Sequence, residues 1–161
     1  MPKTIKMTLS NSGINGALKE VKAYKTWVLR KEKELRLRLA AAGATVASIQ
    51  FSRAIYNGSN DVTVRVDSTG SVAVIYAEGE AVAFVEFGAG AKYGYGHPQA
   101  AQFGVGPGTY PDGKGHWDDP EGWYYEHGKH SYGNPPAMAM YNAVQKMAED
   151  LTTIAREVFR I

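Results

Sequence analysis

The side chains best suited to metal chemistry gather in one stretch of the chain. All four histidines fall between residues 88 and 133, with acidic residues close by: His97, His116, His127, His130, Asp118, Asp119 and Glu126. Zinc needs three or four ligands that converge at about 2 Å from rigid elements. No histidine spacing of a known metal hydrolase helix occurs here, and the last two histidines stand in glycine-containing chain. We therefore expect no metal.

A phosphate-binding loop is the second candidate. Residues 108–115 read Gly-Thr-Tyr-Pro-Asp-Gly-Lys-Gly, which is close to the loop whose backbone amides and lysine hold phosphates ahead of a helix. Gly115 replaces the Ser or Thr that would bind magnesium, and Pro120 follows where a helix should begin. We expect no nucleotide and no other cofactor.

Nucleophilic and acid–base chemistry has little support. Ser131 stands beside His130 without the strand-to-helix elbow of a serine nucleophile. Glu78 and Glu80 flank an expected turn, where carboxylates are usually solvated. Glu86 is different, because it alternates with apolar neighbours in an expected strand. Two interpretations of Glu86 stay open, a surface position on the sheet and a contact between subunits, and we expect no enzyme.

The N-terminal third of the chain predicts helices. Residues 1–11 are short and polar and indicate an arm or an edge strand whose order depends on a neighbour. From about Ser12 apolar residues recur at helical spacing up to Gly43, which predicts a helix end there. A shorter helix, with a strand as the alternative, is expected over residues 45–56 and should end at Asn57 and Gly58.

Strands and a last helix follow. Residues 62–66, 72–76 and 81–87 predict three strands of an antiparallel meander, with turns at 67–71 and 78–80. Asn134 is the expected cap of the last helix, with two prolines in its first turn and a regular apolar stripe: Met140, Val144, Met147, Leu151, Ile154 and Val158. We expect one α+β domain over residues 1–161, with this helix lying across the sheet.

Composition excludes several classes of protein. The apolar share of 44% and the charged share of 21% are typical of globular chains, and no apolar run approaches the roughly 18 residues of a membrane helix. The N-terminus lacks the apolar core of a secretion signal. Without cysteine there is no disulfide, thiol nucleophile or cysteine-ligated metal. We expect no membrane partner.

Charge is divided unevenly along the chain. Residues 1–40 hold ten Lys or Arg against three Glu, and the remainder holds eight against thirteen acids, so the two parts carry about +7 and −5. Such a division can pair the basic end of one subunit with the acidic body of another, or direct lysines to DNA. The candidate residues on the first helix are Lys22, Lys25, Lys31 and Lys33.

A segment rich in glycine and aromatic residues extends over residues 88–134. Residues 88–133 hold twelve of the eighteen glycines and nine of the eighteen aromatic residues. A long loop of this kind is generally functional or disordered, and disordered chain is poor in aromatic residues. We therefore predict a segment held by its own domain or by a neighbouring subunit. The interface candidates are Glu86, Phe87, Tyr93, Tyr95, Trp117, Trp123, Tyr124, Tyr125 and Tyr132.

Two runs of sequence resemble a known family. Residues 81–90 read Ala-Val-Ala-Phe-Val-Glu-Phe-Gly-Ala-Gly and resemble the Glu-Phe-Gly-Thr-Gly signature of siphophage tail-component and minor capsid proteins, with Ala89 in place of threonine. In that family a glycine-rich stretch precedes a proline-containing entry to the last helix. Residues 127–142 resemble this entry, with Ala139 and Met140 in place of the commoner Pro-Phe pair. The order of elements is similar over most of residues 12–160.

The resemblance implies a structural protein of the phage head–tail junction without catalytic residues. It implies assembly in the host cytoplasm as a ring, often of six copies, and a place in the virion between connector or head-closure proteins and the tail. Passive contact with packaged DNA is compatible with it. Tail completion, tail termination and head closure remain alternatives within this class. A metal-dependent phage hydrolase and a small DNA-binding protein are the rival classes.

Overall fold

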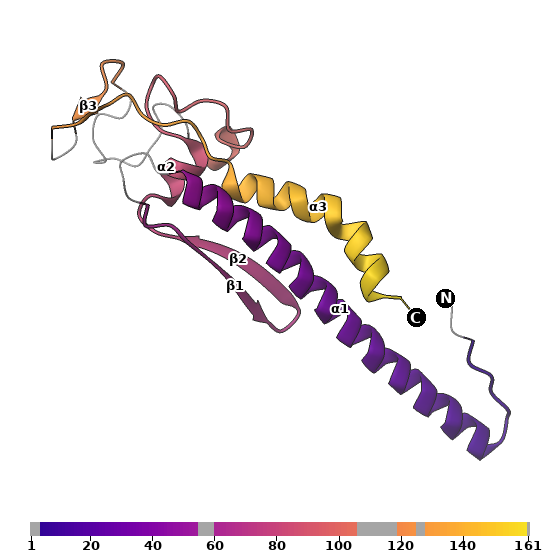
Figure 1. Cartoon of the computed structure of the whole chain (residues 1–161). Coiled ribbons are helices and arrows are strands. Elements are labelled where there is room, and N and C mark those ends of the chain that lie inside the picture. The colour runs from indigo at the N-terminus through magenta and orange to yellow at the C-terminus, as the bar shows by residue number, and fades with distance from the viewer. Residues whose placement is uncertain (1–3, 55–59, 106–118, 125–127, 161) are drawn as a thin grey trace.

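The computed structural model describes residues 4–54, 60–105, 119–124 and 128–160. Its order of elements is α1 (Asn11–Arg53), β1 (Thr63–Thr69), β2 (Val72–Glu78), α2 (Val82–Phe87), a 3-10 turn η1 (Ala101–Phe103), β3 (Trp123–Tyr124), β4 (His130–Ser131) and α3 (Ala139–Val158). The expected α+β class, with a long N-terminal helix, an antiparallel pair of strands and a C-terminal helix, is confirmed (Figure 1). None of the described helices has the length and apolar character needed to cross a membrane.

Helix α1 is one element of 43 residues, where the sequence predicted two. The helical prediction for residues 45–56 is confirmed up to Arg53, but the helix end at Gly43 is wrong. Gly43 is buried where α1 meets β2 and α3, and a Cβ there would lie 2.8 Å from both Ile75 Cδ1 and Met147 Sδ. The glycine therefore allows close packing and does not end the helix. Asn57 and Gly58 lie outside the described residues.

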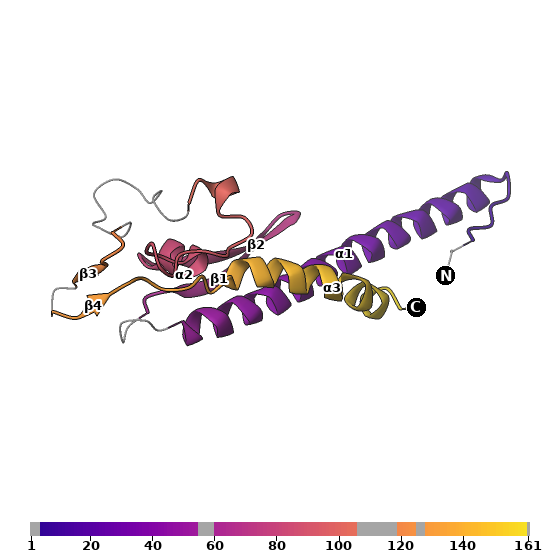
Figure 2. The same ribbon diagram turned by 90° about the horizontal axis from the view of Figure 1, so that it is seen from above.

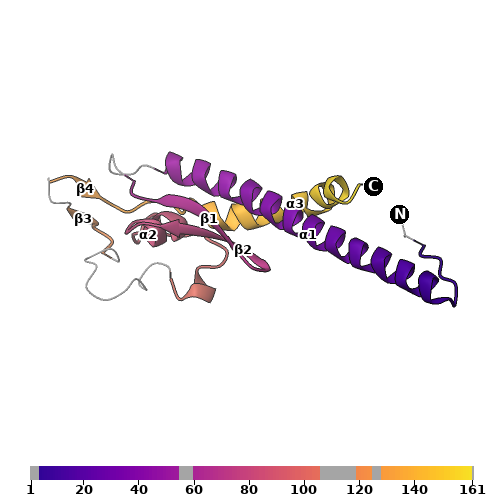
Figure 3. The same cartoon turned by 90° about the horizontal axis from the view of Figure 1, so that it is seen from below.

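The N-terminal half of α1 projects away from the rest of the molecule. At 1.5 Å per residue, α1 is about 64 Å long and the 20-residue α3 only about 30 Å. Trp27 of α1 contacts Phe159, the residue after α3, with ring centroids 5.9 Å apart. Over residues 11–26 every residue except Gly13 and Ala17 is exposed. The three views agree that the first turns of α1 extend beyond the other labelled helices and strands (Figures 1, 2 and 3).

Strands β1 and β2 form a hairpin in register from Thr69↔Val72 to Thr63↔Glu78. Both expected strands are confirmed, and the turn is shorter than expected because pairing continues to Thr69. One face, with Val64, Ile75 and Ala77 half-buried, packs toward the helices. Arg36 of α1 also donates from Nη1 to the carbonyl of Gly70 at 3.2 Å, which fixes the turn against the helix.

The prediction of a third strand over residues 81–87 is wrong, because residues 82–87 form helix α2. The run 81–87 is apolar apart from one residue, and a short apolar run fits a buried helix as well as a strand. Asp61 accepts hydrogen bonds from the backbone N–H groups of Glu80 and Ala81, at the start of the helix. These two amides hold the pKa of the Asp61 carboxyl below its usual value.

Helix α3 has the predicted apolar stripe but not the predicted start. It begins at Ala139 after Met138, which takes a left-handed conformation with φ of 53°, and Asn134 is not its cap. The helix packs along α1 and not across the sheet, so that prediction is also wrong (Figures 1 and 2). The core lies where these helices meet α2, and its buried residues are Ala47, Phe51, Ala54, Val85, Ala139 and Ala143.

Candidate functional site

The two ends of the glycine-rich segment are joined in space. Ala89 and Asn134 form an isolated antiparallel bridge, each donating its N–H to the other's carbonyl at 2.9 Å. The side-chain amide of Asn134 donates to the carbonyl of Phe84 at 2.8 Å, and Ala137 N–H donates to the carbonyl of Val85 at 2.8 Å. The motif around residue 86 and the proline-containing entry to the last helix therefore form one unit. In place of capping α3, Asn134 ties this unit together.

Glycine is required where the segments around Ala89 and Asn134 pass each other. Gly88 has φ of 80° and Gly133 has φ of 98°, which L side chains rarely adopt. A Cβ on Gly133 would overlap the carbonyl oxygen of Ala89, and a Cβ on Gly88 would lie 2.8 Å from Pro136 N. The glycines of both motifs thus serve one close backbone crossing.

Glu86 lies inside this unit and caps α3. Glu86 is only 5% exposed. Oε2 accepts from Met140 N–H at 2.9 Å and Oε1 accepts from Tyr141 N–H at 3.0 Å. These amides belong to the second and third residues of α3, the usual targets of a helix cap, and the helix dipole favours a negative charge there. The residue before α3, Met138, offers no side-chain cap.

His97 completes the environment of Glu86. Its Nδ1 accepts from Gln99 N–H at 3.1 Å, so we assign the ring proton to Nε2, which lies 3.2 Å from Glu86 Oε1 and donates to it. The ring packs between Phe87, with centroids 4.4 Å apart, and Tyr141, at 5.6 Å. His97 is 7% exposed and connects the glycine-rich segment to α2 and α3.

The Glu86–His97 pair makes hydrogen bonds within the fold. Both oxygens of Glu86 already accept backbone N–H groups, and both nitrogens of His97 are engaged. Both side chains are buried. The surface position, one of the two open interpretations of Glu86, is therefore wrong, and contact with another subunit stays a prediction. Over the described ranges no three His, Asp or Glu side chains form a group that could hold a metal.

The aromatic candidates divide into exposed and half-buried residues. Tyr95 and Tyr124 are 61% and 73% exposed. Phe87 is half-buried against His97, and Trp123 is half-buried in β3. Trp117 and Tyr125 lie outside the described residues.

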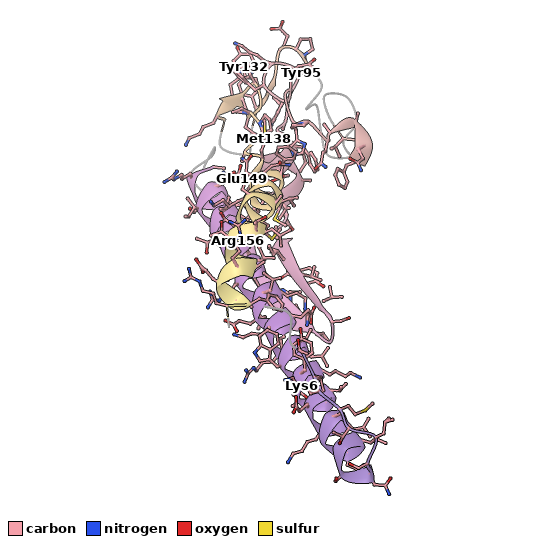
Figure 4. The ribbon with its side chains drawn as sticks, turned by 90° about the vertical axis from the view of Figure 1, so that its right-hand side faces the viewer. Lys6, Tyr95, Tyr132, Met138, Glu149 and Arg156 are labelled. Atoms are coloured by element: carbon pink, nitrogen blue, oxygen red, sulfur yellow. The ribbon has the colours of Figure 1, made fainter. Side chains whose placement is uncertain are left out.

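A mixed row of rings runs along the exposed end of the segment. Tyr124 and Tyr132 both stack edge-on against His130, with centroids 4.5 and 4.6 Å away. Lys92 Nζ lies 4.8 Å from the centre of the Tyr132 ring and 5.3 Å from that of Tyr93. Tyr95 and Tyr132 lie together at one end of the molecule, and Lys6 lies far toward the other (Figure 4).

The candidate lysines are not equivalent. Lys22 and Lys25 are exposed on the projecting half of α1, and Lys33 is exposed further along. Lys31 is half-buried and pairs with Glu34 at 3.0 Å, and this bond holds the pKa of the Glu34 carboxyl below its usual value. Lys31 is therefore engaged within its own helix, whereas Lys22 and Lys25 remain available to a partner.

An apolar groove was missed in the sequence. Its volume is about 480 Å³, and it lies between β2, α1 and α3. Residues 71–75 line one side, and Leu39, Val144 and Met147 contribute apolar side chains from the helices. The half-exposed stripe of α3 was visible in the sequence, but not its position beside a strand. We call this feature the β2 groove.

Comparison of the chain with protein-family models, with curated proteins and with solved structures finds no match.

Proposed function

We propose that this chain is a structural subunit of the head–tail junction of a tailed bacteriophage and that it works by assembling into a ring. The observation that carries the proposal is the interlock between its two motifs. The run at residues 81–90 and the entry at 133–140 are the segments that resemble the siphophage family, and Glu86 of the first caps the helix that follows the second. This contact supports an architectural role for both motifs.

The surface supports assembly as the means of action. Large apolar side chains are exposed on α1, on the hairpin and on α3, among them Leu18 at 51%, Val72 at 55% and Val144 at 55%. Monomeric proteins seldom expose extensive contiguous apolar surface, and such surface marks interaction sites. An elongated subunit with separate exposed apolar surfaces suits a head-to-tail contact, which closes into a ring when the rotation allows.

The ring would have about six copies, as the resemblance implies, and would contact connector or head-closure proteins on one side and tail proteins on the other. The exposed Lys22 and Lys25 on the projecting half of α1 suit passive, sequence-independent contact with DNA in its channel. The exposed rings Tyr93, Tyr124 and Tyr132 suit contacts with neighbouring proteins, because interfaces are enriched in tyrosine.

Deletion of the gene from its phage tests the proposal. Lysates of the deletion mutant should contain filled heads and complete tails that fail to join, when imaged by negative-stain electron microscopy. Supplying the wild-type chain from a plasmid should restore joined particles. Normal yields of joined, infectious virions without the chain would overturn the proposal.

A further inference from the structure

Residues 4–9, which we call the N-terminal arm, have the sequence pattern of a β-strand but belong to no described sheet. They read Thr-Ile-Lys-Met-Thr-Leu. Ile5, Met7 and Leu9 alternate with polar residues, which is the pattern of a strand with one buried face. Met7 is nevertheless 57% exposed and Leu9 is 92% exposed. The arm has no regular secondary structure and pairs with no strand in the part of the molecule that the structure describes.

The β2 groove runs along an open strand edge. Five consecutive residues of the turn and β2, 71–75, line it, and no residue of β1 does. Consecutive residues point to opposite faces of a sheet, so only the edge of the strand can present all of them to one groove. Every second residue of β2 directs its backbone N–H and C=O to this edge. In residues 4–54, 60–105, 119–124 and 128–160 nothing but β1 pairs with β2.

The floor of the groove is apolar and partly uncovered. Leu39 comes from α1, and Met140, Val144 and Met147 come from α3. Val144 is 55% exposed although it belongs to the apolar stripe of its helix. A strand with apolar residues on one face would bury this floor and satisfy the backbone groups of β2. Its six residues span about 20 Å, which matches the seven residues of β2 at about 23 Å.

The arm of the same chain cannot reach the groove. Arg36, the groove residue closest in sequence to the arm, is 25 positions beyond Asn11 along a continuous helix, or about 38 Å. Thr4 is seven positions before Asn11 and spans at most about 25 Å when fully extended. The occupant must therefore come from another copy. The match is apolar, because Ile5, Met7 and Leu9 of the arm would meet a groove lined mainly by apolar side chains.

We propose that the arm of one copy pairs with the open edge of β2 in the next copy and makes the hairpin a three-stranded sheet. Ile5, Met7 and Leu9 then cover the floor of the β2 groove. The contact is an added strand, in which main-chain hydrogen bonds give affinity and alternate side chains give specificity. It joins the far end of one molecule to the body of another, as a ring requires. This inference rests on the proposed function, since it names the surface through which the ring would form.

The first test uses three full-length variants in sedimentation velocity experiments over a range of concentrations. Met7→Asp places a charge on the apolar face of the arm, and Val144→Asp places one on the floor of the groove. Both positions are exposed, so circular dichroism should show unchanged helix content. Each variant should raise the concentration of half-assembly at least about tenfold. Thr4→Asp, on the other face of the arm, should assemble like wild type.

The second test mixes the two defective variants. Met7→Asp retains an intact groove and Val144→Asp retains an intact arm, so together they should form a 1:1 heterodimer and nothing larger. Assembly of both single variants at wild-type concentrations, or failure of the mixture to pair, would overturn the inference while the proposed function stands. A wild-type chain that remains monomeric throughout would overturn both.

Discussion

Replacing Glu86 with Gln should lower the free energy of unfolding by about 2–4 kcal/mol. The carboxylate accepts from two backbone amides of α3 and from His97 Nε2. If the amide oxygen of Gln keeps the position of Oε1, its NH₂ group faces the N–H of Met140. The Met140 N–H then loses its acceptor and the new NH₂ group meets a donor, at a cost of about 1–3 kcal/mol. Loss of the negative charge at the start of α3 adds up to about 2 kcal/mol in a partly buried site.

Thermal unfolding followed by circular dichroism would measure this effect, at concentrations where each variant is monomeric. A chain of this length loses about 2–4 °C of Tm for each kcal/mol, so Glu86→Gln should melt about 4–16 °C below wild type. Glu80→Gln is the matched control, because Glu80 is exposed, and it should stay within about 0.5 kcal/mol. A Glu86→Gln variant as stable as this control would refute the capping role.

Three further predictions concern the glycine crossing, the start of α2 and the aromatic segment. Gly133→Ala should cost more than about 2 kcal/mol, since φ is 98° and the new methyl overlaps a carbonyl, whereas Gly104→Ala, with φ of 65° and open space, should cost about 1–2 kcal/mol in the same denaturant titration. Asp61 has a lowered pKa, so its contribution to stability is present above pH about 4 and is lost as pH falls toward its folded pKa; Asp61→Asn should remove this part of the pH dependence of Tm, and an unchanged profile would count against it. Trp123→Ala should impair assembly, measured by native mass spectrometry, without reducing helix content, and wild-type assembly would contradict its role as an anchor.

The sequence predicted the elements that carry their own periodicity. The apolar stripe of α3 and the alternation around Val64 and Ile75 were sufficient to predict a helix and two strands, because each pattern repeats over several helical turns or strand pairs. Gly43 was misinterpreted because a glycine that ends a helix and one that allows two elements to approach look alike in sequence. Only the position of Met147 beside it separates the two cases.

The role of Glu86 could not be predicted locally. The helix that it caps begins 53 positions later, and its alternation with apolar neighbours fits a strand as well as the buried face of a short helix. The prediction that Asn134 caps α3 followed ordinary local preference, and it failed because a carboxylate from α2 already fills that place. The β2 groove is formed by three separate elements, so it could not be predicted from any one segment of the sequence. The alternating pattern of the arm is visible in the sequence, but the surface that it would pair with is not.

Single-particle electron microscopy of the purified wild-type chain, at increasing protein concentration, tests the claim of ring assembly most directly. We expect closed rings of about six copies, in which each arm contacts the β2 edge of its neighbour. A field containing only separate single chains at every concentration would contradict it.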